Sequence, residues 1–128
     1  MILKDLKANQ VGFYYQTMSD EEEELRDEDG NLTGETAYTY SNPVQEFARI
    51  SPNTTDVEET PFGKDLVYDK MISTVKDLPI SETSRLFIDI VPKINENGST
   101  DTEPDYEVVK VAKDMHQKMW AIRRIEGK

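Results

Sequence analysis

The sequence predicts an all-β domain, a small antiparallel β-barrel or sandwich of about six to seven strands with a long acidic hairpin arm. Two observations lead to this fold class. Short runs with apolar residues at alternate positions recur along the chain, and turn-forming residues separate these runs at close intervals. The chain has 128 residues and no cysteine, so we expect one domain, residues 1–128, whose stability depends on an apolar core.

The strand-like runs begin with Val11–Met18, in which Val11, Phe13 and Tyr15 share one face. The later runs are Glu35–Ser41, Val44–Ser51, Asp65–Val75, Arg85–Val91, Tyr106–Asp114 and His116–Ile125, with a tight turn near Met115–Lys118. Alternation within these runs predicts that much of the core consists of Phe13, Tyr15, Tyr38, Phe47, Leu86, Ile88, Val109, Val111 and Ile122. Only residues 2–10 and 18–26 have a composition that suits a helix.

The stretch DEDGNLTGE, residues 27–35, supplies the glycines that a chain reversal needs. We therefore interpret Val11–Thr17 and Thr33–Tyr40 as the two legs of one hairpin that belong to the barrel. Residues 18–32 are then its projecting acidic arm. A polar segment rich in turn formers, residues 94–105, is predicted to be a mobile loop.

Charge is unevenly distributed along the chain, whose formal net charge is −11. The arm has a local net charge of −7, from one arginine and the eight carboxylates of Asp20, Glu21, Glu22, Glu23, Glu24, Asp27, Glu28 and Asp29. The C-terminal stretch Tyr106–Lys128 has a local net charge of +3. Solvated faces are the simpler interpretation, and contact between unlike surfaces of identical subunits is the alternative. The net negative charge argues against binding DNA through its phosphates.

Two sets of residues are candidates for contacts between proteins. The eight carboxylates form an arm that faces a partner or a channel. Lys118, Trp120, Arg123 and Arg124 are candidates for a subunit or partner interface, and a tryptophan in such a strand is more often a core or interface residue than a platform for a ligand.

Calcium binding is the main chemical alternative for the arm. Asp29, Asn31, Thr33 and Gly34 match the first positions of an EF-hand loop, but Tyr40 stands where the loop requires a glutamate. The flanking runs also resemble strands rather than helices. We therefore favour a turn over a calcium site, and over a disordered acidic linker, which leaves the aromatic strands unexplained.

The sequence gives little indication of catalysis. His116 is the only histidine and lies in a predicted turn, and Glu82 and Asp89 are an acidic pair of a kind that 26 acidic residues produce by chance. We expect a protein that is not an enzyme and binds no cofactor or metal. Lys4, Asp5 and Lys7 interrupt the apolar run that a signal peptide needs, so we expect assembly in the cytoplasm and no membrane span.

An ordered series of segments resembles a known family over about residues 10–125. The segments are FYYQ, DEDGNLTGE, YSNPVQEFARISPN, FGKDLVYDKMIST, DLPISETSRLFID and DYEVVKVAKDMHQKMWAIRRI. In this order they resemble the head-closure proteins of long-tailed phages of Gram-positive bacteria, also called stopper or head-tail joining proteins.

The resemblance implies a structural virion protein at the head-tail junction. Members of this family are β-barrels that form a homo-oligomeric ring below the portal and adaptor proteins, retain the packaged DNA without specific binding, and offer the tail its docking surface. The tail terminator or tail tube would lie below the ring. Two alternatives stay open: a tail-terminator or other tail ring protein, and an acidic DNA-mimic module.

Overall fold

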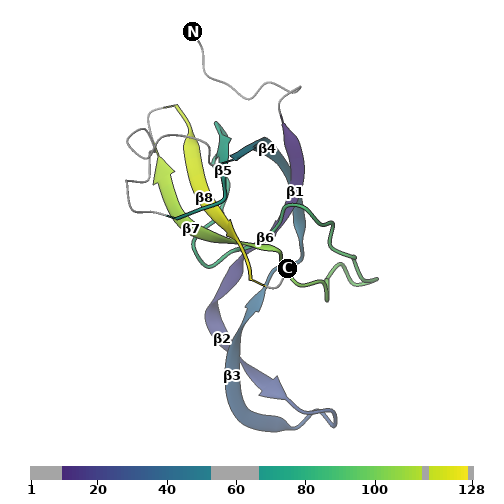
Figure 1. Ribbon diagram of the computed structural model, residues 1–128. Helices are drawn as coiled ribbons and strands as arrows, with labels where there is room; N and C mark the ends of the chain where they lie inside the picture. The colour runs from purple at the N-terminus through teal and green to yellow at the C-terminus, as the bar shows by residue number, and fades with distance from the viewer. Residues whose placement is uncertain (1–9, 53–66, 114–115, 127–128) are drawn as a thin grey trace.

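The computed structural model describes residues 10–52, 67–113 and 116–126, with the backbone alone at residues 20 and 21. Its secondary structure is all-β, as the sequence predicts (Figure 1). A closed antiparallel barrel contains β1 (Val11–Gln16), β4 (Val44–Pro52), β5 (Lys70–Thr74), β8 (Lys118–Arg124), β7 (Tyr106–Lys113) and β6 (Arg85–Phe87), in that order around the barrel. A separate two-stranded sheet contains β2 (Met18–Arg26) and β3 (Leu32–Tyr40).

Closure of the barrel depends on β1, which pairs with strands on both of its sides. Tyr15 lies opposite Val44 of β4 and opposite Leu86 of β6. Every barrel strand has two neighbours, so the sheet closes on itself, although the short strand β6 pairs with β7 only at Tyr106 and Glu107. The hairpin of β2 and β3 projects from one end of this barrel (Figure 1).

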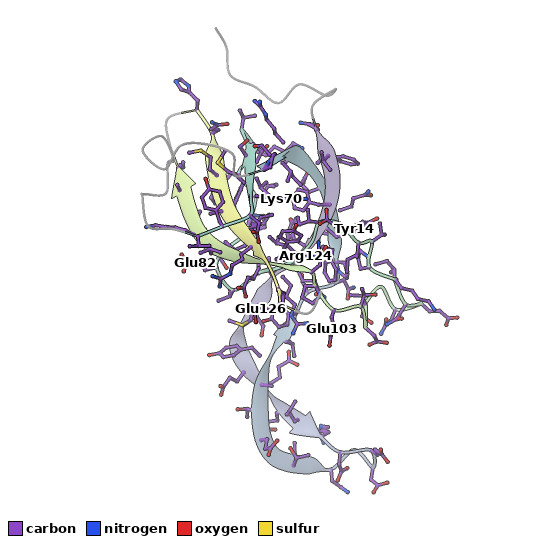
Figure 2. All side chains as sticks on the ribbon, viewed as in Figure 1. Tyr14, Lys70, Glu82, Glu103, Arg124 and Glu126 are labelled. Carbon is purple, nitrogen blue, oxygen red and sulfur yellow. The ribbon has the colours of Figure 1, made fainter. Side chains whose placement is uncertain are left out.

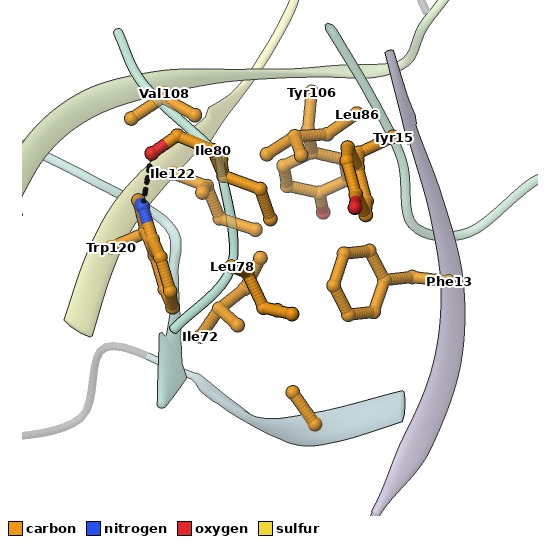
Figure 3. Close-up of a cluster of buried hydrophobic side chains, with 11 residues drawn as sticks. Phe13, Tyr15, Ile72, Leu78, Ile80, Leu86, Tyr106, Val108, Trp120 and Ile122 are labelled. Atoms are coloured by element: carbon orange, nitrogen blue, oxygen red, sulfur yellow. Dashed lines mark hydrogen bonds between the residues drawn. The ribbon is translucent and has the colours of Figure 1, made fainter. Parts of the chain in front are cut away.

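The core fills the barrel with the side chains that alternate inward along its strands. Its fully or nearly fully buried members are Phe13, Tyr15, Ala48, Ile72, Leu78, Ile80, Leu86, Tyr106, Val108, Trp120 and Ile122 (Figure 3). Leu78 and Ile80 come from the connection between β5 and β6. The indole N–H of Trp120 donates a hydrogen bond of 2.9 Å to the backbone oxygen of Ile80, which satisfies a polar group that burial removes from water.

The predicted core is confirmed at Phe13, Tyr15, Leu86 and Ile122, which are buried, while Ile88 and Val111 pack partly buried against them. It is wrong at Tyr38 and Phe47, which are 45% and 46% exposed. Tyr38 lies on β3, outside the barrel. Phe47 lies on the outer face of β4 and covers Gly12 of β1, where an added Cβ would lie 3.0 Å from the Phe47 ring.

The prediction for Val109 is also wrong, because β7 contains a β-bulge at this residue. Val108 pairs with Ile122 and Lys110 pairs with Ala121, so Val109 has no opposite residue. One extra residue reverses the alternation along the strand. Val109 therefore packs in a second cluster with Tyr68, Met119 and Ala121, on the outer face of the sheet.

Several predicted boundaries also change. Residues 18–26, considered for a helix, form strand β2. The strand predicted to reach Val91 ends at Phe87, because the buried carboxylate of Asp105 accepts hydrogen bonds of 2.9 Å from the backbone N–H groups of Ile88 and Asp89. Residues 2–9, Asp65 and Leu66, and the start of the predicted turn near Met115 lie outside the described residues.

The predicted loop 94–105 has regular internal contacts. Ile94 and Thr100 form an isolated antiparallel bridge around a turn in which Gly98 has a φ of 88°. The hydroxyl of Thr100 donates to the backbone oxygen of Lys93 at 2.7 Å. The mobility of this loop stays a prediction.

Truncating the core should destabilise the barrel far more than truncating the arm. We expect Leu86→Ala, at a fully buried position, to lower the free energy of unfolding by about 2–5 kcal/mol. The matched change Leu32→Ala, on a side chain that is 54% exposed, should cost no more than about 0.5 kcal/mol. Urea unfolding followed by tryptophan fluorescence measures both, and equal effects would contradict the assigned core.

Candidate functional site

The arm and two strands of the barrel form one long, interrupted hairpin. β1 pairs with β4 inside the barrel, and their continuations β2 and β3 pair with each other outside it. The expected pairing of Val11–Thr17 with Thr33–Tyr40 is therefore wrong. Val11–Tyr15 pairs with Val44–Ala48, and the whole of Met18–Tyr40 belongs to the arm, which is longer than the predicted 18–32.

Thr17 and Ser41 mark the point where the hairpin leaves the barrel. The backbone N–H of Ser41 donates to the oxygen of Thr17 at 2.9 Å, and the N–H of Thr17 donates to the Ser41 hydroxyl at 3.0 Å. The amide of Gln16 donates to the backbone oxygen of Ser41 at 2.9 Å. Beside this junction, the Arg85 guanidinium lies 3.9 Å from the centre of the Tyr40 ring, an arrangement that favours a cation–π contact.

Carboxylates occupy both faces of the arm. Glu22, Glu23 and Glu24 lie opposite Tyr38, Ala37 and Thr36. Because side chains alternate along a strand, Glu22 and Glu24 share one face and Glu23 lies on the other. These three glutamates are exposed, and the outer part of the arm stands clear of the barrel (Figure 2). Asp20 and Glu21 belong to the same strand.

The tip of the arm is the predicted turn. The Asp27 carboxylate accepts hydrogen bonds from the backbone N–H groups of Asp29 at 3.0 Å and Asn31 at 2.9 Å. Gly30 has a φ of 83°, the left-handed conformation that glycine adopts without steric cost. Asp27 thus orders the turn, whereas the side chains of Glu28 and Asp29 are exposed.

Tyr40, at the position that an EF-hand gives to glutamate, pairs with Met18 in the strand ladder. Within the described residues, no three acidic, histidine or cysteine side chains are grouped so that they could hold a metal ion.

Two irregularities interrupt the ladder of the arm. Between the pairs Met18/Tyr40 and Glu22/Tyr38, and again between Glu24/Thr36 and Arg26/Leu32, one strand has three residues where the other has one. The extra residues lie in β2 near the root and in β3 near the tip, where Gly34 has a φ of 84°. Bulges of this kind bend a strand and interrupt an edge on which another strand could pair.

The predicted C-terminal interface residues do not form one surface. Lys118 begins β8, and Arg123 and Arg124 end it, so that Lys118 and Arg123 lie roughly 17 Å apart along an extended strand. Trp120 is fully buried in the core, so its predicted interface role is wrong. Sequence alternation alone could have placed it beside Ile122, which was correctly predicted to point inward.

The two arginines pair with carboxylates of the same chain. The Arg123 guanidinium lies 2.8 Å from Glu107, which raises the pKa of Arg123 through a hydrogen bond and charge attraction. Arg124 lies 3.2 Å from Asp89.

Asp89 is the centre of a polar network that sequence reasoning did not predict. Its carboxylate accepts hydrogen bonds from Lys70 at 3.1 Å, the Tyr106 hydroxyl at 3.0 Å and Arg124 at 3.2 Å (Figure 2 labels Lys70 and Arg124). Partial burial alone would raise the pKa of Asp89, but these hydrogen bonds and positive charges leave it below the ordinary value. Glu82, its imagined catalytic partner, takes no part in the described contacts of this network.

His116 is exposed beside Lys113 and Lys118, where the three side chains line a hollow of about 180 Å³. This hollow lies at the far end of the barrel from the arm, where β7 ends and β8 begins (Figure 1).

No protein-family model, curated protein or solved structure matches the chain. Within the described residues, the structure contains no helix with the length and apolar character of a membrane span.

The Asp89 network should make stability depend on pH. Because the pKa of Asp89 is lower when folded than when unfolded, its contribution is present above about pH 4 and is lost as pH falls through the folded pKa. We expect Asp89→Asn to lower the urea midpoint at pH 7, and the difference from wild type to shrink toward pH 3. Asp77→Asn is the control, since Asp77 is 89% exposed. A difference that is constant with pH would contradict the network's role.

The arm should be removable without unfolding the barrel. Replacing residues 18–40 by Asn-Gly joins Thr17 to Ser41, which already lie within hydrogen-bonding distance, through a two-residue hairpin turn. We expect cooperative unfolding and a stability within about 1–2 kcal/mol of wild type, because the deleted residues contribute little to the core. A loss of the cooperative transition in denaturant would show that the barrel needs the arm.

Proposed function

We propose that this protein is a head-closure protein of a long-tailed phage, a ring-forming virion component that retains packaged DNA below the portal and adaptor and provides the docking surface for the tail. One observation carries the proposal: a closed barrel projects a long hairpin whose carboxylates face outward on both sides. This architecture agrees with the fold that the family resemblance implies.

The position of the charge supports the proposal. Met18–Tyr40 is exposed over most of its length, so its carboxylates keep their water and their negative charge. In the centre of a ring, the exposed carboxylates at the tips of such arms, Glu28 and Asp29, repel the phosphates of the duplex, which blocks the channel without adhesion to DNA. A basic arm would bind the duplex and release counterions instead.

The internal polar contacts support a structural role over a catalytic one. The groups that converge around Asp89 satisfy one another: Lys70, Arg124 and Tyr106 all donate to its carboxylate. A site that binds a substrate needs polar groups directed at open space. The arm, by contrast, exposes the side chains of Glu23, Glu24, Glu28 and Asp29 to its surroundings.

The phage itself tests the proposal. In a phage carrying the Asn-Gly replacement of residues 18–40, we expect heads that package DNA but leak it or fail to join tails, while tails assemble to normal length. Electron microscopy of lysates and nuclease sensitivity of the packaged DNA measure these outcomes.

A second variant, Glu22→Gln, Glu23→Gln and Glu24→Gln, keeps the length of the arm and removes three charges. It should give an intermediate defect in DNA retention, because a neutral arm still obstructs the channel. Tails of abnormal length beside sound, filled heads would instead indicate a tail terminator. Competition of the arm with DNA for a host protein would indicate a DNA mimic, and full infectivity without the arm would overturn its proposed role.

A further inference from the structure

The barrel has two chemically different ends. At one end, the paired row of Gln16, Arg85, Glu107 and Arg123 lies next to the root of the acidic arm. At the other end, Lys118 pairs with Thr74 of β5 and with Lys113 of β7. The cations at this second end define what we call the lysine rim: Lys76, Lys113 and Lys118.

Two lysines of the rim face each other across a strand pair. Lys113 and Lys118 are directly opposite in the antiparallel ladder, so their side chains lie on the same face. Like charges in this arrangement destabilise a sheet. Since Trp120 points into the barrel, Lys118, two residues earlier on β8, lies on the same side and at the mouth of the barrel. The fold thus concentrates positive charge at this mouth at some cost in stability.

Among the described residues, carboxylates compensate the charge of the rim only in part. Lys76 is firmly held, 2.9 Å from the Glu46 carboxylate and 2.8 Å from the backbone oxygen of Phe47. Lys118 donates to the backbone oxygen of Leu78 at 3.2 Å and lies 3.4 Å from the Asp77 carboxylate, whose side chain is 89% exposed. An ion pair with so exposed a partner is weak and easily exchanged for another carboxylate. Asp77 therefore occupies the place that a carboxylate from another chain would take.

We propose that the lysine rim binds the acidic arm of a second copy of this chain, with the glutamates of β2 above Lys113 and Lys118. The inference names a contact between the copies of the proposed ring and in this respect rests on the proposed function. Charge complementarity selects the occupant: the arm stretch Asp20–Gly30 has a net charge of −7 and no other part of the sequence is as acidic.

The geometry requires the arm to come from another molecule. A chain's own arm leaves the opposite end of its barrel and projects away from the rim (Figure 1). Contact between an arm and a rim therefore joins unlike surfaces of two copies, and such a head-to-tail contact closes into a ring or continues as a filament. Glu22 and Glu24, about 7 Å apart on one face of β2, provide two carboxylates for the paired lysines.

Cysteine cross-linking of the purified chain tests this contact, because the natural sequence has no cysteine. Thr36→Cys lies opposite Glu24 on the arm and keeps every carboxylate, and Asp77→Cys lies in the rim and keeps every lysine. Mixed under oxidising conditions, the two variants should form a covalent dimer in about tenfold greater yield than Thr36→Cys with the control Asp101→Cys, a difference of ~1.4 kcal/mol. Asp101 is exposed in the loop between β6 and β7.

Charge reversal then tests the chemistry of the contact. Adding Lys113→Glu and Lys118→Glu to the Asp77→Cys chain should reduce the yield to the control level. Adding Glu22→Lys and Glu24→Lys to the Thr36→Cys chain should restore it. High salt should abolish the difference, because at about 1 M the screening length falls to about 3 Å.

A cross-linking yield equal to that of the control pair, or a yield that charge reversal does not change, would contradict the proposed contact. Binding of poly-glutamate to the rim without cross-linking of the arm variant would also contradict it, because the partner would then be a different acidic protein. The result is separable from the proposed function, because cross-links form in the purified chain whether or not a phage without the arm retains its DNA.

Discussion

The junction between Thr17 and Ser41 is the constraint on which the rest of the molecule depends. On one side of it, β1 and β4 must pair in the register that buries Phe13, Tyr15 and Ala48 and closes the barrel. On the other side, the same two chain segments must separate from the core and pair only with each other. Backbone and side-chain hydrogen bonds at the junction hold the two segments together where they leave the other strands of the barrel. An isolated two-stranded hairpin is marginally stable in water, so the arm owes its alignment to the barrel end of the hairpin.

The sequence was sufficient for the fold class and for much of the core, because alternation at Phe13, Tyr15, Leu86 and Ile122 is a direct consequence of strand geometry. It was insufficient wherever a contact distant in sequence decides the outcome. The bulge at Val109 depends on the register with β8, and the outward position of Phe47 depends on which face of β4 meets Ile72 and Trp120. The leg assignment failed for a similar reason: Thr33–Tyr40 has the residues of a barrel strand, but β1 already has β4 and β6 as its neighbours.

For the candidate site, local charge located the acidic stretch of β2 and the turn after it, since these residues are contiguous in the chain, but it did not give the extent of the arm. The positive end could not be placed in this way. Arg123 and Arg124 neighbour Lys118 in the sequence, yet β8 separates them along its length and the arginines pair with Glu107 and Asp89. The lysines that do converge come from β7, β8 and the segment after β5, and only the closed barrel brings them to one mouth. The acidic arm and the lysine rim therefore lie at opposite ends of the molecule, which the net charge of the chain does not indicate.

Because the hairpin is interrupted, the length of the arm can change independently of the barrel. Adding two residues to each of β2 and β3 preserves which side chains face which side, because strands repeat every two residues. Each such insertion lengthens the arm by about 7 Å and leaves the pairing of β1 with β4 untouched. One barrel therefore suits arms of different reach, and variation in length is expected in residues 18–40 rather than in the strands that enclose Trp120.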